Sequence, residues 1–241
     1  MPADPTYPVL TDSLSDRIVA LTGFQRTSQI SRASRLAWEA GDQRPMMAEV
    51  ETRRREIIEG VISEIRDEWR PIRDALKRAG KMPGHAADIG CGTAINDVFL
   101  WQDFRPHLTL IDIEETPEQY HMFADTGAGY ASLAAARRLL EENGVPPGGI
   151  TTINPVNEPG ATDHVAPDLA ISLLSCGFHY PIDDYLDLFL GTLDRGGAVV
   201  LDLRNKYRAR GSAALDALFG AGTPDVIAEA GRHQRILLTR T

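Results

Sequence analysis

Residues 86–94 read Ala86-Ala87-Asp88-Ile89-Gly90-Cys91-Gly92-Thr93-Ala94, a short apolar run that leads through an acid into two closely spaced glycines. Glycine lacks a Cβ atom, so it adopts backbone angles that other residues avoid and lets a ligand approach the main chain closely. The pattern therefore predicts the end of a strand, a tight glycine turn, and a helix that begins near Thr93.

Two acids frame this turn. Asp88 closes the first predicted strand, and Asp112 closes the next apolar run, residues 108–111, 24 positions further on. A Rossmann-type unit presents a carboxylate to a ribose about 20 residues beyond its glycine turn, so the spacing predicts a nucleoside-binding crevice. A dinucleotide fingerprint would place a third glycine at position 95, where this chain has Ile95. Without that glycine, the close approach of a pyrophosphate loses its usual support.

The pattern that is present, acid-x-Gly-x-Gly-x-small, is filled by Asp88, Gly90, Gly92 and Ala94. Here the chain resembles the class I S-adenosylmethionine-dependent methyltransferases over about residues 84–241. In that family the glycine loop lines the methionine moiety and the acid after the second strand holds the ribose hydroxyls. The resemblance therefore implies S-adenosylmethionine as the cofactor. Many members have glycine in place of Ala94, a departure we expect to be mild because alanine costs little in the first turn of a helix.

Ligands of an open parallel sheet bind outside the carboxyl ends of its strands. The candidate cofactor-binding residues lie at those ends and are Asp88, Gly90, Cys91, Gly92, Asp112, Ile113, Asn154 and Leu174. Asn154 follows the third predicted strand, and its amide can meet an adenine edge with both a donor and an acceptor. The alternative is that Asn154 only initiates a turn with Pro155.

The run at residues 173–181 follows the fourth predicted strand and contains the sequence Phe178-His179-Tyr180. Methyl transfer to a hydroxyl requires that the acceptor be aligned and that its proton be taken up, and an imidazole suits this task near neutral pH. We therefore predict His179 as the catalytic base, with His121 as a second candidate. Phe178, Tyr180 and Arg204 are the predicted substrate contacts. The alternative for His179 is a hydrogen bond to the start of the next helix.

Three short segments, Gly177-Phe178-His179-Tyr180-Pro181, Thr126-Gly127-Ala128-Gly129-Tyr130 and Asn154-Pro155, resemble a group of sugar O-methyltransferases. This narrower resemblance implies a hydroxylated small-molecule acceptor, a saccharide or a sugar-like metabolite, and S-adenosylhomocysteine as the product. Two alternatives stay open. One is a non-catalytic S-adenosylmethionine-binding protein with a regulatory or scaffolding role, and the other is a nicotinamide-dependent oxidoreductase, which Ile95 disfavours.

Composition limits the other possibilities. The 241 residues, 43% hydrophobic and 24% charged, are typical of a globular protein with one sizeable core. A formal net charge of −9 opposes nucleic-acid binding. The N-terminus does not read as a signal peptide, no run approaches a membrane span, and the two cysteines form no disulfide framework. We expect a cytoplasmic protein without membrane partners and with no required metal, since Asp183 and Asp184 suit the first turn of a helix. A homodimer stays open.

The order of patterns predicts an α/β protein. Residues 1–84 read as a helical extension, either a lid over the crevice or a packing or dimerisation layer, and residues 85–241 as the binding domain. In the extension we expect helices over 13–21 and 27–40 and a long helix after Pro45 that Pro71 kinks or ends. The domain alternates strands with helices and ends in a hairpin. This predicts a Rossmann-like, mostly parallel, seven-stranded sheet with helices on both faces and a C-terminal antiparallel hairpin.

Overall fold

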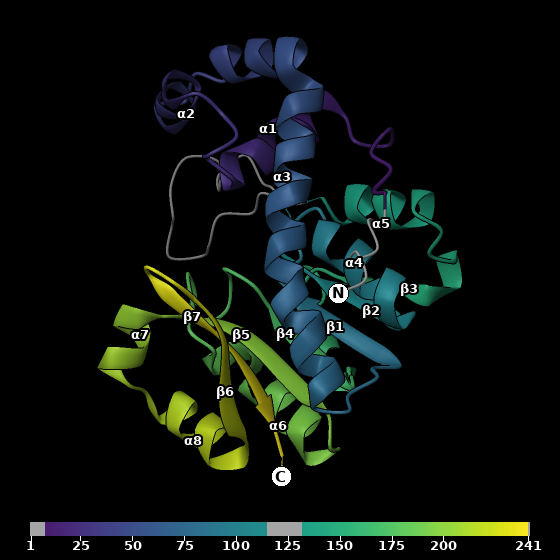
Figure 1. The fold of residues 1–241 in the computed structure, drawn as a ribbon, viewed down its shortest axis with the longest axis vertical. Coiled ribbons are helices and arrows are strands. Elements are labelled where there is room, and N and C mark those ends of the chain that lie inside the picture. The colour runs from purple at the N-terminus through teal and green to yellow at the C-terminus, as the bar shows by residue number, and fades with distance from the viewer. Residues whose placement is uncertain (1–7, 115–131, 241) are drawn as a thin grey trace, which may run out of the picture.

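Seven strands form one sheet at the centre of the molecule, shown in the computed structural model of Figure 1, which describes residues 8–114 and 132–240. The strands are β1 (His85–Ile89), β2 (His107–Ile111), β3 (Ile150–Ile153), β4 (Leu169–Ser172), β5 (Ala198–Arg204), β6 (Thr223–Ala230) and β7 (His233–Thr239). Their order across the sheet is β3-β2-β1-β4-β5-β7-β6. The strands β1 to β5 run parallel, whereas β7 pairs antiparallel with both β5 and β6.

This strand order, with one antiparallel strand inserted next to β5, is the Rossmann-like arrangement of class I methyltransferases. The predicted fold class is therefore confirmed, including the C-terminal hairpin and the helices that precede the sheet. The chain leaves β1 in one direction toward β2 and β3 and in the other toward β4 and β5. That reversal opens a crevice at the carboxyl ends of β1 and β4.

Helices cover both faces of the sheet. One face carries α3 (Arg44–Arg78), α4 (Ile95–Phe104) and α5 (Leu133–Glu142), and the other carries α6 (Leu186–Asp194) and α8 (Ala213–Ala221). Each face of the sheet has its own apolar core. On β5, Ala198 and Val200 pack into the core beneath α3, α4 and α5, and the side chains that pack into the core beneath α6 and α8 are Val199, Leu201 and Leu203. Because side chains alternate along a strand, one continuous apolar run fills both cores.

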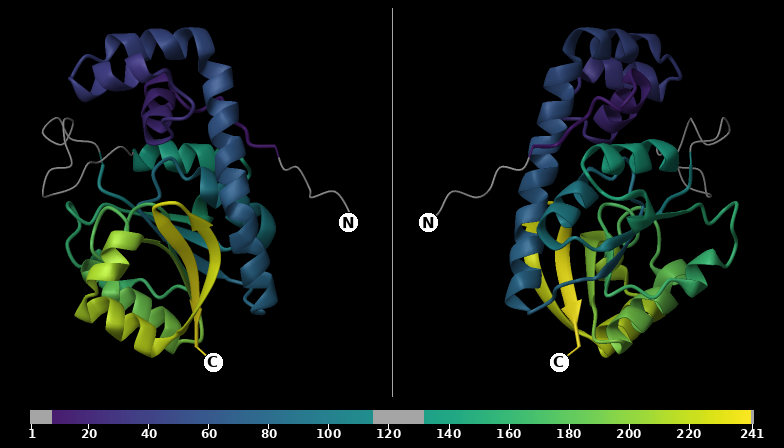
Figure 2. Two further views of the ribbon diagram at one scale, coloured as in Figure 1. Left: turned by 60° about the vertical axis from the view of Figure 1, so that its left-hand side comes forward. Right: turned by 90° about the vertical axis from the view of Figure 1, so that its right-hand side faces the viewer.

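The N-terminal extension begins with α1 (Asp16–Gln25) and α2 (Arg32–Glu39). The side chains of Ser15 and Ser31 cap these helices by accepting hydrogen bonds from the backbone N–H groups of Ile18 and Ser34. Both helices start later than predicted, because apolar spacing alone does not reveal which serine is the cap. Figure 2 shows α1 and α2 at one end of the molecule and α6 and α8 at the other, with α3 running between the two ends.

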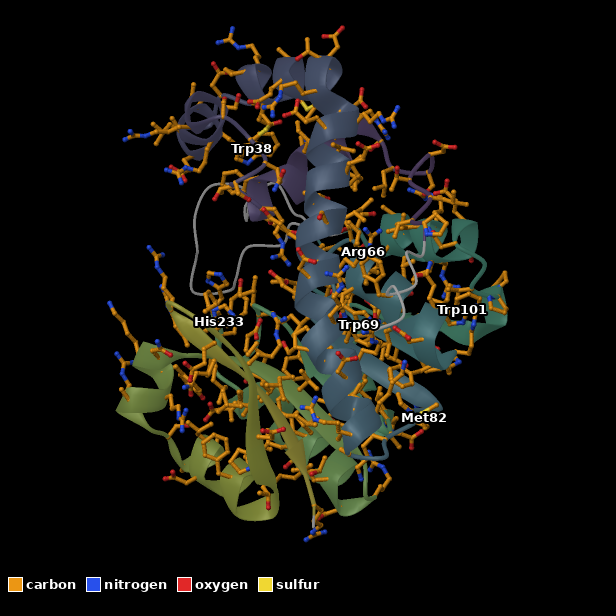
Figure 3. All side chains as sticks on the ribbon, viewed as in Figure 1. Trp38, Arg66, Trp69, Met82, Trp101 and His233 are labelled. Carbon is orange, nitrogen blue, oxygen red and sulfur yellow. The ribbon has the colours of Figure 1, made fainter. Side chains whose placement is uncertain are left out.

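The prediction that Pro71 kinks or ends the long helix needs correction, because α3 continues to Arg78 and its non-helical backbone lies at Arg53 instead. Proline inside a helix costs about 3 kcal/mol. Trp69, Ile72 and Leu76 are at most 2% exposed, and burying each such side chain contributes about 1.5–3 kcal/mol, which offsets that cost. Trp69, labelled in Figure 3, is also anchored by its indole N–H. This group donates to Asp103 Oδ2 at 2.9 Å.

The remaining elements are short. They are α7 (Asn205–Arg210), which the sequence pattern did not predict, and the 3₁₀ turns Pro147–Gly149, Ala161–His164 and Asp183–Tyr185. Strand β6 begins at Thr223, and it tolerates Pro224 because it lies at the edge of the sheet. Among the described residues, the helices include none that is long and apolar enough to cross a membrane.

Candidate functional site

A cavity of about 890 Å³ lies at the carboxyl ends of β1, β2, β4 and β5. Its floor is the glycine turn after β1, and its walls are the segments that follow β2, β4 and β5. The end of α1 and the residues after it, from Thr22 to Thr27, contribute the remaining wall. The N-terminal extension therefore takes part in the cavity and also packs against the sheet through α3.

The glycine turn depends on positive φ angles and close packing. Gly90 has a φ of 78° and Gly92 a φ of 57°, values that L-residues with a side chain rarely adopt. The Gly90 N–H donates to the carbonyl of Ile111 at 2.7 Å, which ties the turn to β2. A Cβ atom on Gly90 would lie 2.1 Å from Ser175 Oγ, in the loop after β4. Glycine at position 90 thus lets the loops after β1 and β4 meet.

Ala94 departs from the expected structure. It is the residue before α4, with φ 59° and ψ 25° in the left-handed region, and it is fully buried. The prediction that Ala94 sits in the first helical turn is therefore wrong. A left-handed alanine carries a backbone cost of about 1–2 kcal/mol that a glycine would avoid.

Asp112 joins the second strand to the turn. Its Oδ2 accepts the Gly92 N–H at 2.7 Å, and the residue lines the cavity beside Ile113. Withdrawal from water raises the pKa of Asp112 to about 7, although the hydrogen bonds from the Gly92 and Ile113 backbone act in the opposite direction. The carboxyl group therefore titrates close to neutral pH.

Asp88 forms a buried acidic pair with Asp97, a residue of α4. Asp88 and Asp97 are 5% and 1% exposed, and their carboxyl groups are direct neighbours. Burial first and then the neighbouring Asp97 raise the pKa of Asp88 well above its usual value, and burial raises the pKa of Asp97 to about 7. Asp88 Oδ1 and both oxygens of Asp97 lack a donor among the described groups. The region around the glycine turn is thus acidic, and some of its carboxyl oxygens accept no hydrogen bond within the described structure.

The loop after β4 holds the predicted base. His179 donates its backbone N–H to the carbonyl of Ser175 at 2.8 Å, and Gly177 donates to that of Tyr180 at 2.7 Å. Gly177 has a φ of 87°, and a Cβ there would lie 2.7 Å from Leu203 Cδ2. The turn is therefore compact and places His179 on the cavity wall. Burial first, and then the nearby Arg204, lower the pKa of His179, so its imidazole is neutral at pH 7.

An aromatic cluster surrounds this loop. The ring of Phe178 contacts His179 edge-on at 4.8 Å between centroids and His233 at 5.3 Å, and the guanidinium of Arg204 lies 5.2 Å from the centre of the Phe178 ring. His233, labelled in Figure 3, is the first residue of β7. Phe178, His179, Tyr180 and Arg204 all line the cavity, so the predicted catalytic and substrate-binding residues of this region lie together.

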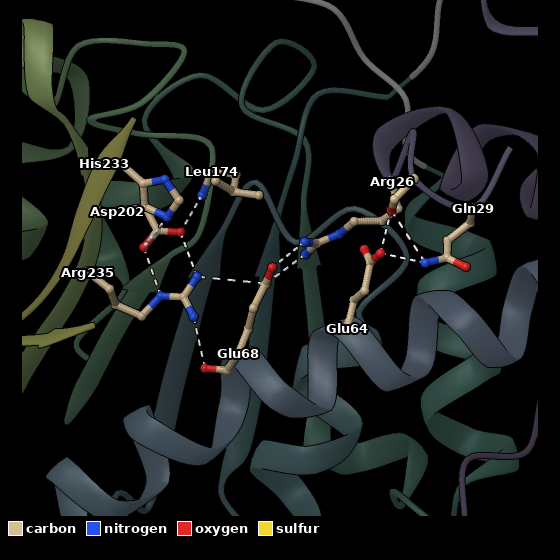
Figure 4. A network of polar contacts seen from close by, with 9 residues as sticks. Arg26, Gln29, Glu64, Glu68, Leu174, Asp202, His233 and Arg235 are labelled. Carbon is tan, nitrogen blue, oxygen red and sulfur yellow. Dashed lines mark hydrogen bonds and ion pairs between the residues drawn. The ribbon is translucent and has the colours of Figure 1, made fainter. Parts of the chain in front are cut away.

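A chain of ion pairs links the extension to the cavity loop (Figure 4). The carboxylate of Glu68 on α3 accepts hydrogen bonds from both terminal guanidinium nitrogens of Arg26, which lines the cavity. The Glu68 backbone carbonyl accepts a hydrogen bond from Arg235 at 2.8 Å, and Arg235 in turn contacts Asp202. Asp202 Oδ2 accepts the N–H of Leu174 at 3.2 Å, where φ is 54°. Leu174 also lines the cavity, so this series of contacts connects two parts of the cavity wall, Arg26 and Leu174.

Two predicted residues are placed differently. Asn154 is 7% exposed and is not part of the cavity wall. Its Oδ1 accepts the Val156 N–H at 3.1 Å and its Nδ2 donates to Glu114 Oε2 at 3.4 Å, which fits the alternative of a turn. A contact to adenine stays a prediction. His121 lies outside the described residues.

Other cavity residues were not predicted from the sequence. They include Thr22, Phe24 and Gln25 of α1, the following residues Arg26 and Thr27, and also Asn96, Val156, Tyr185 and Arg232. The apolar periodicity of α1 indicates a helix but not which surface the helix covers, and Arg232 gave no signal because hairpin turns are ordinarily exposed and polar. The described residues contain no group of three or more His, Cys, Asp or Glu side chains that could hold a metal ion.

No protein-family model matches the chain, and no curated protein matches it. Solved structures that are similar to it include three methyltransferases. An O-methyltransferase family protein from Burkholderia thailandensis is 13% identical over 97% of this chain and 75% of that one, with a TM-score of 0.47. A methyltransferase from Pyrococcus furiosus is 17% identical over 70% and 81%, with a TM-score of 0.43. Magnesium protoporphyrin IX methyltransferase from Synechocystis, with bound SAH, is 15% identical over 73% and 83%, with a TM-score of 0.45.

Proposed function

We propose that this protein is an S-adenosylmethionine-dependent methyltransferase that acts on a hydroxyl oxygen of a small metabolite. The observation that carries the proposal is that Asp88, Asp112 and the glycine turn between them line one cavity. In this arrangement Asp112 is placed to accept the ribose hydroxyls and the backbone of Gly90 to Gly92 to border the methionine moiety. Ile113 and Leu174 offer apolar contacts in the same cavity.

The charge of the site favours this ligand over a dinucleotide. Asp88, Asp97 and Asp112 gather near the glycine turn, where Asp88 and Asp112 line the cavity. A pyrophosphate at this place would raise the pKa values of these carboxyl groups further, whereas a ligand with an ammonium and a sulfonium group would favour their ionised forms. The unpartnered Asp88 Oδ1 fits a positively charged donor. The buried residue Ile95 at the third fingerprint position agrees with this choice.

S-adenosylmethionine, when bound, supplies an electrophilic methyl group on a positively charged sulfur. The task of the chain is to hold the acceptor hydroxyl in line with that methyl group and to remove the proton from the hydroxyl. His179 suits the second task, because its lowered pKa keeps the imidazole neutral and able to accept a proton at pH 7. Phe178 and Tyr180 flank His179 and are positioned to fix the acceptor.

The experiment that tests the function combines binding with turnover. Calorimetry should show that the protein binds S-adenosylhomocysteine and S-adenosylmethionine and does not bind NAD. The protein should then transfer an isotope-labelled methyl group from S-adenosylmethionine to a component of a low-molecular-weight cell extract. Binding without transfer to any component would instead support the non-catalytic alternative, and preferential binding of NAD would reject the proposal.

A further inference from the structure

Two arginines line the cavity at the end of β5 and in the turn before β7, whereas Asp88 and Asp112 line it at the ends of β1 and β2. Arg204 is the last residue of β5, and Arg232 belongs to the turn between β6 and β7. The β5–β7 register places Arg204 directly opposite His233, the neighbour of Arg232 in the chain. Asn205 also donates its backbone N–H to the carbonyl of Arg232 at 2.9 Å. The sheet and this hydrogen bond thus fix the two backbones next to each other, and both residues line the cavity.

Neither guanidinium has an acidic partner among the described residues. Arg26, the third arginine of the cavity, is occupied by Glu68, and the buried Arg235 nearby is occupied by Asp202. By contrast, the Arg204 guanidinium lies over the face of Phe178 and near the imidazole of His179, and neither of these neighbours is an acid. Asp184, an acid that also lines the cavity, forms no ion pair with Arg204 or Arg232 within that structure. Two positive charges therefore stay available to a ligand.

The cavity is consequently bipolar. Asp88 and Asp112 stand at the glycine turn, and Arg204 and Arg232 stand at the ends of β5 and β7. A positively charged ligand group favours the ionised carboxylates at the first end, and a negatively charged group is attracted to the guanidinium groups at the second. Arginine also binds carboxylate and phosphate groups with two parallel hydrogen bonds, which fixes their orientation. This distribution matches a positive cofactor at one end and a negative acceptor at the other.

We infer that the methyl acceptor is an anionic hydroxylated metabolite whose carboxylate or phosphate group binds to Arg204 and Arg232 while its hydroxyl lies at His179. The inference rests on the proposed function and narrows its substrate class. Arg204 and His179 are tied together by the loop itself, because the Arg204 N–H donates to the carbonyl of Gly177 at 3.0 Å. The anion and the reacting hydroxyl should therefore lie only a few bonds apart in the acceptor.

The first test does not require that the acceptor be identified beforehand. The protein is incubated with isotope-labelled S-adenosylmethionine and a low-molecular-weight cell extract, and the labelled products are separated on an anion-exchange column at pH 8. Label in the retained fraction is the expected result. Label confined to the unretained, neutral or cationic products would overturn the inference and leave methyl transfer standing. Label in no fraction would overturn the proposed function and the inference with it.

The second test assigns the anion to the two arginines. With the unmethylated acceptor purified from the extract as substrate, Arg204→Gln and Arg232→Gln should each raise KM about tenfold or more, since a hydrogen bond to a charged group contributes about 1.5–3 kcal/mol. Arg210→Gln, at the exposed end of α7, is the matched control and should leave KM unchanged. Calorimetric affinity for S-adenosylhomocysteine should stay the same in all three variants, which shows that they fold. An unchanged KM in both cavity variants would overturn the assignment.

Discussion

Asp202 and Arg235 are direct cross-strand partners in the β5–β7 register, and both are at most 3% exposed. Arg235 donates from Nε to Asp202 Oδ1 and from Nη2 to Asp202 Oδ2, each at 2.8 Å. The second oxygen also accepts the N–H of Leu174. A buried ion pair of this geometry is therefore shared between the C-terminal hairpin and the loop that borders the cavity, so its loss should affect both.

Replacing Arg235 with methionine should destabilise the protein strongly. The Arg235→Met variant keeps an unbranched apolar stem but leaves Asp202 buried without its guanidinium partner, which typically costs about 3–5 kcal/mol of unfolding free energy. Arg240→Met is a matched control, because Arg240 pairs with Asp194 while both side chains are more than half exposed, and such pairs contribute about 0–1 kcal/mol. Urea denaturation measures both effects. Equal losses in the two variants would contradict the role of the buried pair.

Glu68 should govern how firmly α1 is held over the cavity. Glu68→Gln removes the charge that pairs with Arg26 while it keeps the backbone carbonyl that Arg235 uses. We expect faster amide hydrogen exchange in α1 and unchanged exchange in β1, since local opening reflects local contacts. Glu59→Gln, which removes an exposed pair with Arg55, is the control. Unchanged exchange in α1 would show that apolar packing alone holds this helix.

The sequence was most informative where function depends on neighbouring strands. Asp88 and Asp112 could be placed together because the carboxyl ends of adjacent parallel strands meet at one edge of a sheet, and their strands β1 and β2 are in register there. The position of His179 could be predicted for the same reason, because its loop follows the carboxyl end of β4, the other neighbour of β1. Arg235 could not be identified in this way. In the sequence Arg235 stands between Gln234 and the apolar run 236–238, and its partner Asp202 becomes apparent only once the β5–β7 register is known.

Other errors arose where tertiary packing overrides a local rule. Pro71 reads as a helix breaker, yet Trp69 and Ile72 bury enough apolar surface to carry the helix through it. Ala94 reads as an ordinary residue of a first helical turn, yet the close packing of the glycine turn forces it into a left-handed conformation. The contribution of α1 to the cavity was invisible for a related reason, because a helical pattern does not specify which surface the helix covers.

Asp112 should be the main determinant of cofactor affinity. Asp112→Asn keeps an oxygen that can accept the Gly92 N–H, so the turn is expected to persist, but it removes the charge that would receive the ribose hydroxyls. We expect the affinity for S-adenosylhomocysteine to fall about tenfold or more, as for a hydrogen bond to a charged group. Asp216→Asn on the exposed side of α8 is the control. Calorimetry that finds the Asp112 variant unimpaired would remove this residue from the ribose site.

His179 should affect turnover and not cofactor binding. His179→Gln retains a polar side chain of similar size without a group that accepts a proton. General-base catalysis typically contributes about a hundredfold or more, so methyl transfer should fall by about that factor while the affinity for S-adenosylhomocysteine stays unchanged. His164→Gln, in an exposed 3₁₀ turn, is the control. Full activity of the His179 variant in the labelled-methyl assay would exclude it as the base.

The buried acids should make the ligand-free protein less stable as pH rises. The pKa of Asp97 is about 7 in the folded protein, against 3.8 for a carboxyl group free in water. Between these two values the folded state binds more protons than the unfolded state, so this contribution is fully present below about pH 4 and is lost as pH rises through 7. For each extra proton that the folded state binds, the unfolding free energy falls by up to about 1.4 kcal/mol for every unit by which pH rises.

Urea denaturation of the ligand-free protein between pH 5 and pH 8 measures this slope. Asp97→Asn removes one of the titrating groups and releases Asp88 from a neighbouring charge, so the decline in stability over this range should become shallower. The variant should therefore gain stability relative to the unmodified protein at pH 8 and less at pH 5. Asp216→Asn, which removes an exposed acid, should leave the slope unchanged. Parallel curves for the Asp97 variant and the unmodified protein would contradict a pKa of about 7 for Asp97.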